Sequence, residues 1–219
     1  MPSRSIEDYL KNIYHLQVED RSVNTTTLAA ALKISPASVS EMVAKLSRSG
    51  HIKNHPYHGF KLTKEGEKVA VNLVRKHRLI EVFLTERLKY SWDEVHNEAE
   101  KFEHVCSDEF IDKLDRYLGH PRLDPHGDPI PDKNGKLKDE KSRLLANAEG
   151  GKNYFVSKVN DTNNEFLKYI ARLGIKLKTK ISIKEKLKFD NSLLVRVGRK
   201  DHLLSNKIAE NISVAEYLN

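Results

Sequence analysis

The sequence predicts a mainly α-helical protein with small β parts: a winged helix-turn-helix, then a helical segment, then a small β-barrel. Three observations indicate this fold class. Apolar residues recur at helical spacing through most of the chain up to Leu118. Proline and glycine gather between residues 120 and 152, which is typical of a linker. Beyond Gly150 and Gly151, short apolar runs alternate with polar residues, as they do in strands.

The first module can be predicted element by element. Residues 5–8, Ser-Ile-Glu-Asp, are typical of a capping box and start a helix. A second helix follows residues 25–27. Ser35 and Pro36 open a third helix that runs to Gly50, because serine is a good N-cap and proline fits the first helical position. Residues 50–55 and 60–63 indicate two strands around a turn at 56–59, so the helix-turn-helix carries a wing.

The later elements follow the same periodicities. A long apolar helix is expected from about Gly66 to Tyr90, then a helix that a capping box opens at Ser91 and that reaches about Cys106, then a helix over 108–118. The linker at 120–152 could hold one short helix near residues 144–145. Strands are expected over 154–156, 180–183, 193–197 and 212–214, and a small β-barrel is the natural closure for strands this short.

Composition limits the class of protein. The 219 residues suit two or three small modules, and 38% hydrophobic residues are enough for buried cores. No apolar run approaches the roughly 18 residues of a membrane span, and the N-terminus lacks a signal-peptide core, so we expect a soluble protein with no membrane partner. The single cysteine, Cys106, excludes an internal disulfide and fits a reducing cytoplasm.

The net charge of +7 suits a polyanionic partner, but its distribution is uneven. Residues 1–74 carry ten basic and seven acidic side chains, whereas residues 153–219 carry thirteen and seven. Most of the excess therefore lies outside the predicted winged helix.

Side chains that could carry chemistry gather on two predicted helices. In the helix after Ser91, four titratable side chains stand at offsets 0, 4, 7 and 8, on one face beside an apolar stripe: His96, Glu100, Glu103 and His104. The preceding helix adds His77 and Glu81. A buried carboxylate must be paired, and a metal ion is one such partner. The alternative is a solvated helix face with a core histidine at 77, and Asp8 could serve only the amides of its capping box.

Four segments stand out along the chain: Asp8-Tyr9-Leu10, RKHRLIE at 75–81, VHNEAEKFEHV at 95–105 and HGDPIP at 126–131. Together with the helix-turn-helix they resemble the diphtheria-toxin-repressor family, and the resemblance covers at least residues 5–131. It implies a winged-helix DNA-binding domain over 1–74, a helical dimerisation and metal-binding domain over 75–142, a linker over 143–152 and an SH3-like, FeoA-like domain over 153–219. It also implies a homodimeric repressor of metal-homeostasis genes that binds operator DNA when loaded with metal. We therefore expect neither enzyme activity nor a small organic substrate.

The resemblance implies two metal sites in each subunit. The primary site would use Asp8, Glu100, Glu103 and His104. The ancillary site would use His77, Glu81 and His96, and our candidate from the C-terminal domain is Asp161. The iron-sensing prototype has methionine and cysteine at the positions of Asp8 and Glu100, whereas manganese-sensing relatives have carboxylates.

Three carboxylates and one imidazole form a hard ligand set, so we expect Mn²⁺ in preference to Fe²⁺. The two-domain manganese regulators have a glutamate where this chain has Lys11, and a cation there argues against their closely spaced metal pair. Cys106 lies on the apolar stripe, and we interpret it as a core residue.

The third helix is the predicted recognition helix. Small residues at its start allow a close approach to bases, and the basic residues after them suit phosphates. The candidate DNA-contacting residues are Ser35, Pro36, Ala37, Ser38, Ser40, Glu41, Lys45, Arg48 and the wing residue Lys61.

As a hypothesis, metal clasps the N-terminal helix to the dimerisation helix and so sets the spacing of two recognition helices. Two alternatives stay open. One is a winged-helix regulator that senses an organic ligand. The other is a helical-bundle metalloenzyme, which the lack of a His-Glu-x-x-His motif disfavours.

Overall fold

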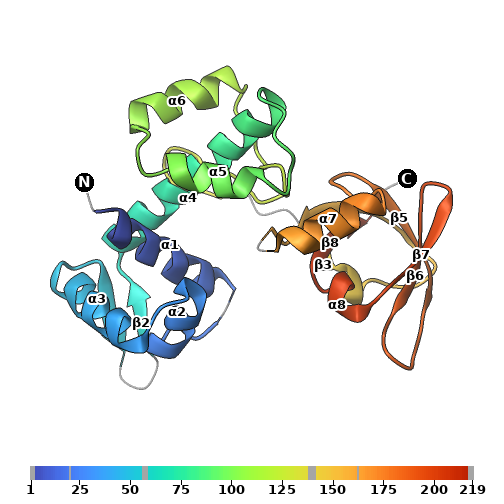
Figure 1. Ribbon diagram of the computed structural model, residues 1–219, viewed down its shortest axis with the longest axis horizontal. Coiled ribbons are helices and arrows are strands. Elements are labelled where there is room, and N and C mark those ends of the chain that lie inside the picture. The colour runs from blue at the N-terminus through green and yellow to red at the C-terminus, as the bar shows by residue number, and fades with distance from the viewer. Residues whose placement is uncertain (1–2, 20, 56–58, 138–141, 162, 217–219) are drawn as a thin grey trace. The chain divides into compact units, whose positions relative to one another are not determined.

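The computed structural model describes residues 3–19, 21–55, 59–137, 142–161 and 163–216. Figure 1 shows the helices and strands along the chain. The chain divides into two compact units. The first unit comprises residues 1–77, 100–113 and 131–137, and the second comprises residues 78–99, 114–130 and 138–219. Among the described residues, no helix combines the length and the apolar character that crossing a bilayer requires.

The first unit contains the predicted winged helix. Its elements are α1 (Arg4–Val18), α2 (Thr25–Leu32), α3 (Pro36–Arg48), β1 (Ile52–His55), β2 (Gly59–Leu62) and the start of α4 (Lys64–Glu86). The side chain of Asn24 caps α2 and accepts a hydrogen bond from the Thr27 amide at 2.9 Å. Ser35 caps α3, and Pro36 stands at its first position, as predicted. One buried cluster, which includes Leu10, Leu28, Val39, Leu46 and Phe60, joins these elements.

The predicted capping box at residues 5–8 is wrong. Helix α1 begins at Arg4, and Ser3 is its N-cap residue without a side-chain hydrogen bond. The wing forms as expected, with Ile52 opposite Leu62 in an antiparallel pair, while residues 56–58 of its predicted turn lie outside the described residues. At Gly59 the backbone has a φ of +78°, and a Cβ atom would lie 2.0 Å from the Val23 carbonyl oxygen. Only glycine therefore fits this approach of the wing to the chain before α2.

Three helices follow the wing, and two of them are shorter than predicted. Helix α4 ends at Glu86, before a left-handed residue at Lys89. Helix α5 spans only Val95–Phe102, because residues 92–94 form a turn and the Ser91 hydroxyl bonds the Glu94 carboxylate at 2.6 Å. Residues 103 and 104 lie in the turn after α5, so the single helix face predicted for them does not exist. Helix α6 spans Asp108–Tyr117, close to its predicted range.

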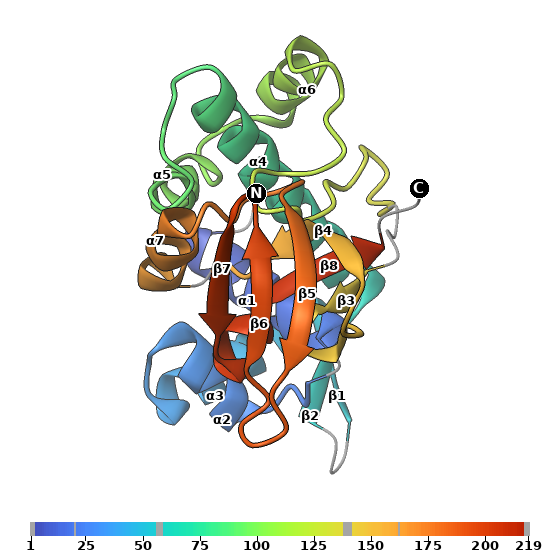
Figure 2. The ribbon, with the colours of Figure 1, turned by 90° about the vertical axis from the view of Figure 1, so that its right-hand side faces the viewer.

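The second unit contains the β part, whose strands form one antiparallel sheet in the order β3-β8-β4-β5-β6-β7 (Figures 1 and 2). The strands are β3 (Arg143–Leu144), β4 (Asn153–Val159), β5 (Lys180–Lys186), β6 (Leu193–Val197), β7 (Lys200–Leu204) and β8 (Ile212–Glu216). Four of the six were predicted. Strand β7, the short strand β3 and the helices α7 (Asn164–Arg172) and α8 (Asn206–Ala209) were not.

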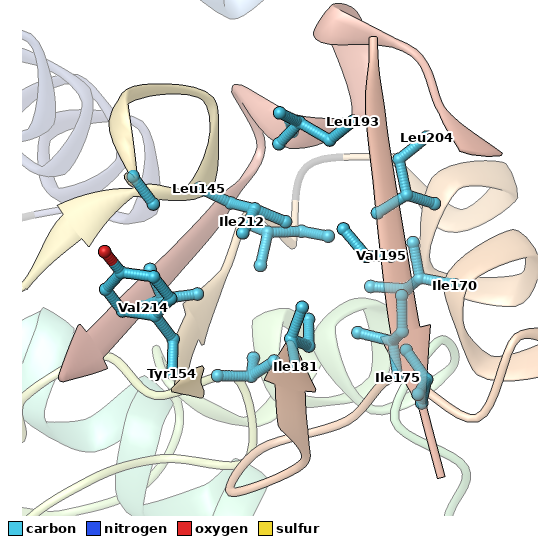
Figure 3. Close-up of a cluster of buried hydrophobic side chains, with 14 of the residues drawn as sticks. Leu145, Tyr154, Ile170, Ile175, Ile181, Leu193, Val195, Leu204, Ile212 and Val214 are labelled. Carbon is cyan, nitrogen blue, oxygen red and sulfur yellow. The ribbon is translucent and has the colours of Figure 1, made fainter. Parts of the chain in front are cut away.

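Leu145 anchors the start of this sheet. It lies in the 3-10 helix η1 (Leu145–Asn147), at the place where a short helix was expected, and it is fully buried with Tyr154, Ile181 and Val195 (Figure 3). Strand β3, just before it, pairs with β8. Residues within the segment predicted as a linker, 143–152, thus take part in the sheet and its core. The boundaries predicted for the three domains and the linker stay a prediction.

Candidate metal sites and recognition helix

The first candidate site lies in the first unit, where α1 meets the turn after α5. Asp8 comes from α1, and Glu103 and His104 come from that turn. His104 Nε2 lies 3.0 Å from Asp8 Oδ1 and 3.3 Å from Glu103 Oε1. Ligand atoms about 2.1 Å from a cation and at right angles to each other are about 3.0 Å apart. Two carboxylate oxygens and one imidazole nitrogen therefore already converge at a spacing that fits a divalent ion.

Glu7 holds His104 in this orientation, a role that the sequence analysis missed. Its Oε2 lies 2.7 Å from His104 Nδ1, and both side chains are mostly buried, at 18% and 7% exposure. A carboxylate at Nδ1 places the proton on that nitrogen and leaves Nε2 as a lone-pair donor. Glu7 and Asp8, adjacent on α1, thus contact the two opposite nitrogens of one imidazole.

Lys11 and His77 both contact Glu103. The Lys11 ammonium donates to Glu103 Oε1 at 2.9 Å and to Oε2 at 2.8 Å, and it lies 3.3 Å from His77 Nδ1. His77 Nδ1 is in turn 2.5 Å from Glu103 Oε2. All three side chains are buried. His77, predicted for the ancillary site, thus also contacts this carboxylate of the primary set.

The charges around the first site shift its two carboxylates in opposite directions. Burial acts to raise the pKa of Glu103, but the hydrogen bond from His77 and the charge of Lys11 outweigh it, and this pKa is lowered. Burial raises the pKa of Asp8, an effect that the nearby His104 opposes and Glu103 reinforces. Glu103 is therefore held ionised by its neighbours, whereas the Asp8 carboxylate gains more from a bound cation.

Glu100 is the one predicted primary ligand outside this convergence. It lies on α5 as an exposed residue, and it does not belong to the trio of Asp8, Glu103 and His104 whose ligand atoms lie within 4.8 Å of one another. Its role as a ligand stays a prediction.

A second candidate site lies in the second unit. Glu81 on α4 is fully buried, and its Oε1 lies 3.3 Å from His96 Nδ1 on α5. His96 Nδ1 is also 3.5 Å from Oδ2 of Asp161, which follows β4. His96 thus faces two of its predicted partners. Ligand atoms of His77, Glu81 and His96 also lie within 4.8 Å of one another, with His77 one helical turn before Glu81 on α4, so all four predicted ancillary residues gather here.

His126 completes this cluster. It is fully buried, and its Nε2 donates to the Trp92 carbonyl at 2.7 Å. That bond fixes the tautomer and leaves Nδ1 as a lone-pair donor. Nδ1 has no hydrogen bond within the described residues, and it faces carboxylate oxygens of Glu81 and Asp161, each 3.9 Å away. A buried imidazole lone pair aimed at two carboxylates requires a proton or a cation between them.

Two local contacts hold the His126 loop in place. Gly127 has a φ of +94°, and a Cβ atom there would lie 2.1 Å from the Ser157 carbonyl oxygen on β4. Asp124 is buried, and its Oδ1 accepts the amides of His126 and Asp128 at 2.8 and 2.9 Å. Burial raises the pKa of Asp124 well above its usual value, and Asp128 and Glu81 add to this effect. Asp124 also lies within 4.8 Å of Glu81 and His126 ligand atoms, so it borders the second site.

The recognition helix presents its predicted residues to solvent. All nine candidate DNA-contacting residues are exposed: Ser35, Pro36, Ala37, Ser38, Ser40, Glu41, Lys45, Arg48 and Lys61. Some of the hydroxyls also have local partners. Ser35 caps the helix, and the Ser40 hydroxyl donates to the Pro36 carbonyl at 3.0 Å. Helix α1 contacts α3 through Tyr9, whose hydroxyl donates to the Ser38 carbonyl at 3.4 Å.

Cys106 lies two residues after His104 and is half-buried, not exposed. The Lys76 ammonium donates to its carbonyl oxygen at 2.7 Å. Burial raises the pKa of its thiol, and the charge of Lys76 offsets this only in part. No candidate metal group within the described residues includes this sulfur.

A winged helix with an exposed recognition helix, whose α1 also supplies part of a carboxylate and imidazole pocket, defines a metal-dependent transcriptional regulator. Comparisons with known proteins give the same class. Residues 1–60 match the family described as iron dependent repressor, N-terminal DNA binding domain. Residues 63–132 match the metal binding and dimerisation domain of the iron dependent repressor, and residues 143–216 match the FeoA domain. The chain thus belongs to the diphtheria-toxin-repressor family of metal-dependent transcriptional repressors, which are not enzymes.

Individual relatives agree with this assignment. An uncharacterised helix-turn-helix transcriptional regulator of Methanocaldococcus jannaschii is 39% identical over 53% of this chain and 94% of its own. The iron-dependent repressor IdeR of Mycobacterium leprae is 35% identical over 57% of this chain, but only 54% of its own length is matched. A solved structure described as a manganese-dependent transcriptional repressor in complex with manganese is 34% identical. It covers 97% of this chain and 100% of its own, with a TM-score of 0.89.

Proposed function

We propose that this repressor binds operator DNA as a homodimer when Mn²⁺, or less favourably Fe²⁺, occupies two sites in each subunit, and that it thereby controls metal-homeostasis genes. The observation that carries the proposal is the convergence of Asp8, Glu103 and His104 in the first unit. The first carboxylate belongs to the winged helix and the other two ligands to the turn after α5. A divalent ion bound there would supply two positive charges that attract both sides.

The chain's own residues determine what such an ion changes. Asp8 and Glu103 are like charges, and two carboxylates about 5 Å apart repel by roughly 3 kcal/mol at an effective dielectric of 20. Lys11 and the histidines already offset part of this repulsion on the side of Glu103. The remaining repulsion acts on Asp8, and therefore on α1, which contacts α3 through Tyr9. A cation bound by Asp8 would hold α1 in place, and α1 contacts the recognition helix α3 through Tyr9.

The preference for manganese follows from the donor atoms. The first site offers carboxylate oxygens and one imidazole, and the second offers Glu81 and Asp161 with His96 and His126. Carboxylates suit Mn²⁺, whereas thiolates would select Cu⁺ or Zn²⁺. His77, Glu100 and Asp124 are additional candidate ligands at the edges of these sets.

The homodimer is supported by apolar surface in the first unit. Phe102, Val105 and Phe110 are 42%, 76% and 49% exposed. A homodimer would bury side chains of this kind. Because its proposed target is operator DNA, we expect the protein to act in the cytoplasm.

The test measures DNA affinity at buffered free Mn²⁺, by fluorescence anisotropy with the promoter region of the protein's own gene. The wild type should gain affinity as free Mn²⁺ rises. Asp8→Ala should remain a folded dimer without this gain, whereas Glu19→Ala, a control at the exposed end of the same helix, should respond like the wild type. A full metal response in Asp8→Ala would contradict the proposal that a metal ion links α1 to the turn after α5.

Metal content tests the second site independently. After equilibrium dialysis against Mn²⁺, the wild type should retain two ions per chain. His126→Ala and Asp8→Ala should each retain one. No bound metal in the wild type would favour the regulator that senses an organic ligand.

A further inference from the structure

The positive charge of the chain is concentrated in one short stretch of the β part, residues 176–200, which we call the basic segment. It contains nine basic and two acidic side chains, an excess of seven. The chain's 38 basic and 31 acidic residues leave 29 of each kind outside it, so the basic segment accounts for the whole net charge of +7. All nine basic residues are exposed: Lys176, Lys178, Lys180, Lys184, Lys186, Lys188, Arg196, Arg199 and Lys200.

Strand pairing brings several of these cations to one face of the sheet. The basic segment covers β5, β6 and the start of β7, which lie side by side (Figure 2). On β5, the buried Ile181 and Ile183 alternate with Lys180 and Lys184. The two lysines therefore lie on the face that points away from the core. Arg196 on β6 is exposed between two buried valines and lies on the same outer face.

Few carboxylates neutralise this surface. Arg196 pairs with Asp201 on β7 at 2.6 and 2.8 Å, and Lys186 donates to the Ala146 carbonyl at 2.8 Å. With two acidic residues against nine basic ones, most of the positive charge has no carboxylate to pair with inside the segment. Neighbouring cations repel one another, and a polyanion bound to this face would relieve that repulsion.

Exposed apolar side chains accompany these cations. Phe189, in the loop between β5 and β6, is fully exposed and directly follows Lys188. Leu203 on β7 is also exposed, near the same end of the sheet, because the next residue of β7 pairs with Leu193 at the start of β6. Proteins that hold DNA mainly by its backbone place basic side chains together with apolar ones such as phenylalanine against the minor groove. The combination of charge and exposed phenylalanine therefore suits a nucleic acid.

We propose that the basic segment is a second DNA-contacting surface, which binds the phosphates of duplex DNA without reading its sequence. This inference rests on the proposed function, which makes duplex DNA the partner of this chain. The recognition helix brings that duplex to the protein, so its phosphates are at high effective concentration for the basic segment. The winged helix alone has a small excess of positive charge, with ten basic and seven acidic residues in 1–74. The basic segment thus supplies much of the charge that phosphate binding requires.

The test compares two triple variants that lose the same charge. One combines Lys180→Gln, Lys184→Gln and Lys188→Gln in the basic segment. The matched control combines Lys113→Gln, Lys133→Gln and Lys168→Gln, three exposed lysines outside it. Fluorescence anisotropy measures the affinity of the Mn²⁺-loaded proteins for a promoter duplex at several salt concentrations. In the first variant, the slope of log affinity against log salt concentration should become less steep by about two to three, and binding at about 0.1 M salt should weaken at least tenfold. The control should keep the wild-type slope.

Three results would overturn the inference. The first is a wild-type slope in the variant of the basic segment. The second is an equal loss in both triple variants, since only net charge would then matter. The third is binding of the wild type to anionic lipid vesicles that the basic-segment variant loses while its DNA affinity is unchanged, because the surface would then serve a membrane.

Lys188→Glu keeps the inference testable if the triple variant does not fold, because residue 188 lies in the loop after β5, outside the strands. This single change reverses one charge and should make the slope less steep by at least about one. An unchanged slope in the folded single variant would also overturn the inference.

These outcomes are distinct from failure of the proposed function. If metal does not control operator binding, the wild type will gain no affinity with Mn²⁺, but the triple variant will still show a shallower slope on a duplex of unrelated sequence. If the basic segment does not contact DNA, the Mn²⁺ response will be present and the slopes of the wild type and the triple variant will be equal.

Discussion

The contact between Glu7 and His104 gives the sharpest test of the first site. Glu7→Gln keeps the size of the side chain and removes its charge. The wild-type carboxylate lies 2.7 Å from His104 Nδ1, and the exposure of the two side chains is 18% and 7%, so solvent screens this contact little. A hydrogen bond to a charged group contributes about 1.5–3 kcal/mol. The variant should therefore bind Mn²⁺ about 10- to 100-fold more weakly at the first site.

The direction of this effect follows from the tautomer of His104. With a carboxylate at Nδ1, the proton stays there and Nε2 faces Asp8 and Glu103 as a donor of electrons. A glutamine can present its amide group to Nδ1, which favours the proton on Nε2, where it blocks a cation. Glu7 is thus a positioning residue that acts through His104.

The assay is competition between the protein and a fluorescent chelator for Mn²⁺, in a His126→Ala background that leaves only the first site. Glu19→Gln, at the exposed C-terminal end of the same helix, is the control for loss of one negative charge. Equal affinities of Glu7→Gln and the wild type would refute the argument. An equal loss in both glutamine variants would show that only net charge matters.

Further predictions concern stability and DNA binding. Gly59→Ala should lower the free energy of unfolding by more than about 2 kcal/mol, because its Cβ would lie 2.0 Å from a carbonyl oxygen. Gly50→Ala, with a similar φ but open space, should cost about 1 kcal/mol, so equal losses in denaturant titrations would contradict the steric argument. Leu145→Ala should cost about 2–5 kcal/mol and its half-exposed neighbour Leu144→Ala under about 1, and a reversed order would contradict the place of η1 in the core. Arg48→Ala should lower the slope of log DNA affinity against log salt concentration by about one. An unchanged slope would show that Arg48 does not contact a phosphate. Removal of metal with a chelator should leave the circular dichroism spectrum unchanged, because both cores are apolar, and unfolding would contradict this.

Local signals in the sequence predicted the winged helix well. Ser35 and Pro36 determine the start of α3 locally, because the Ser35 side chain accepts a hydrogen bond from the Ser38 amide. The five residues of β6 likewise show the alternation of buried and more exposed side chains that a strand requires. The same local reasoning failed at residues 5–8 and at 91–94, where the acidic side chains have partners other than backbone amides: Glu7 and Asp8 contact His104, and Glu94 accepts a hydrogen bond from Ser91. The sequence of a capping box does not show whether its acidic residue has another partner.

The candidate sites were only partly predictable, for a related reason. Asp8, Glu103 and His104 could be named because a family resemblance linked segments far apart in the sequence. The contacts of Glu7, Lys11 and His126 span 97, 92 and 34 residues, and no periodicity in the sequence indicates them. His126 did carry one signal, a histidine beside a glycine in a proline-rich stretch, where a titratable ring has no obvious structural reason to be. Helix α7 also had a signal, the capping residue Asn163, but only strands were predicted between residues 153 and 219.

The environment of Cys106 has a consequence for what the protein can sense. Oxidants attack the deprotonated form of a thiol, and burial raises the pKa of Cys106, which favours the protonated form. Peroxide in a stressed cell should therefore modify this residue more slowly than an exposed cysteine, although it stands two positions from a proposed metal ligand. A regulator built in this way would respond to the supply of metal without confusing it with oxidative damage.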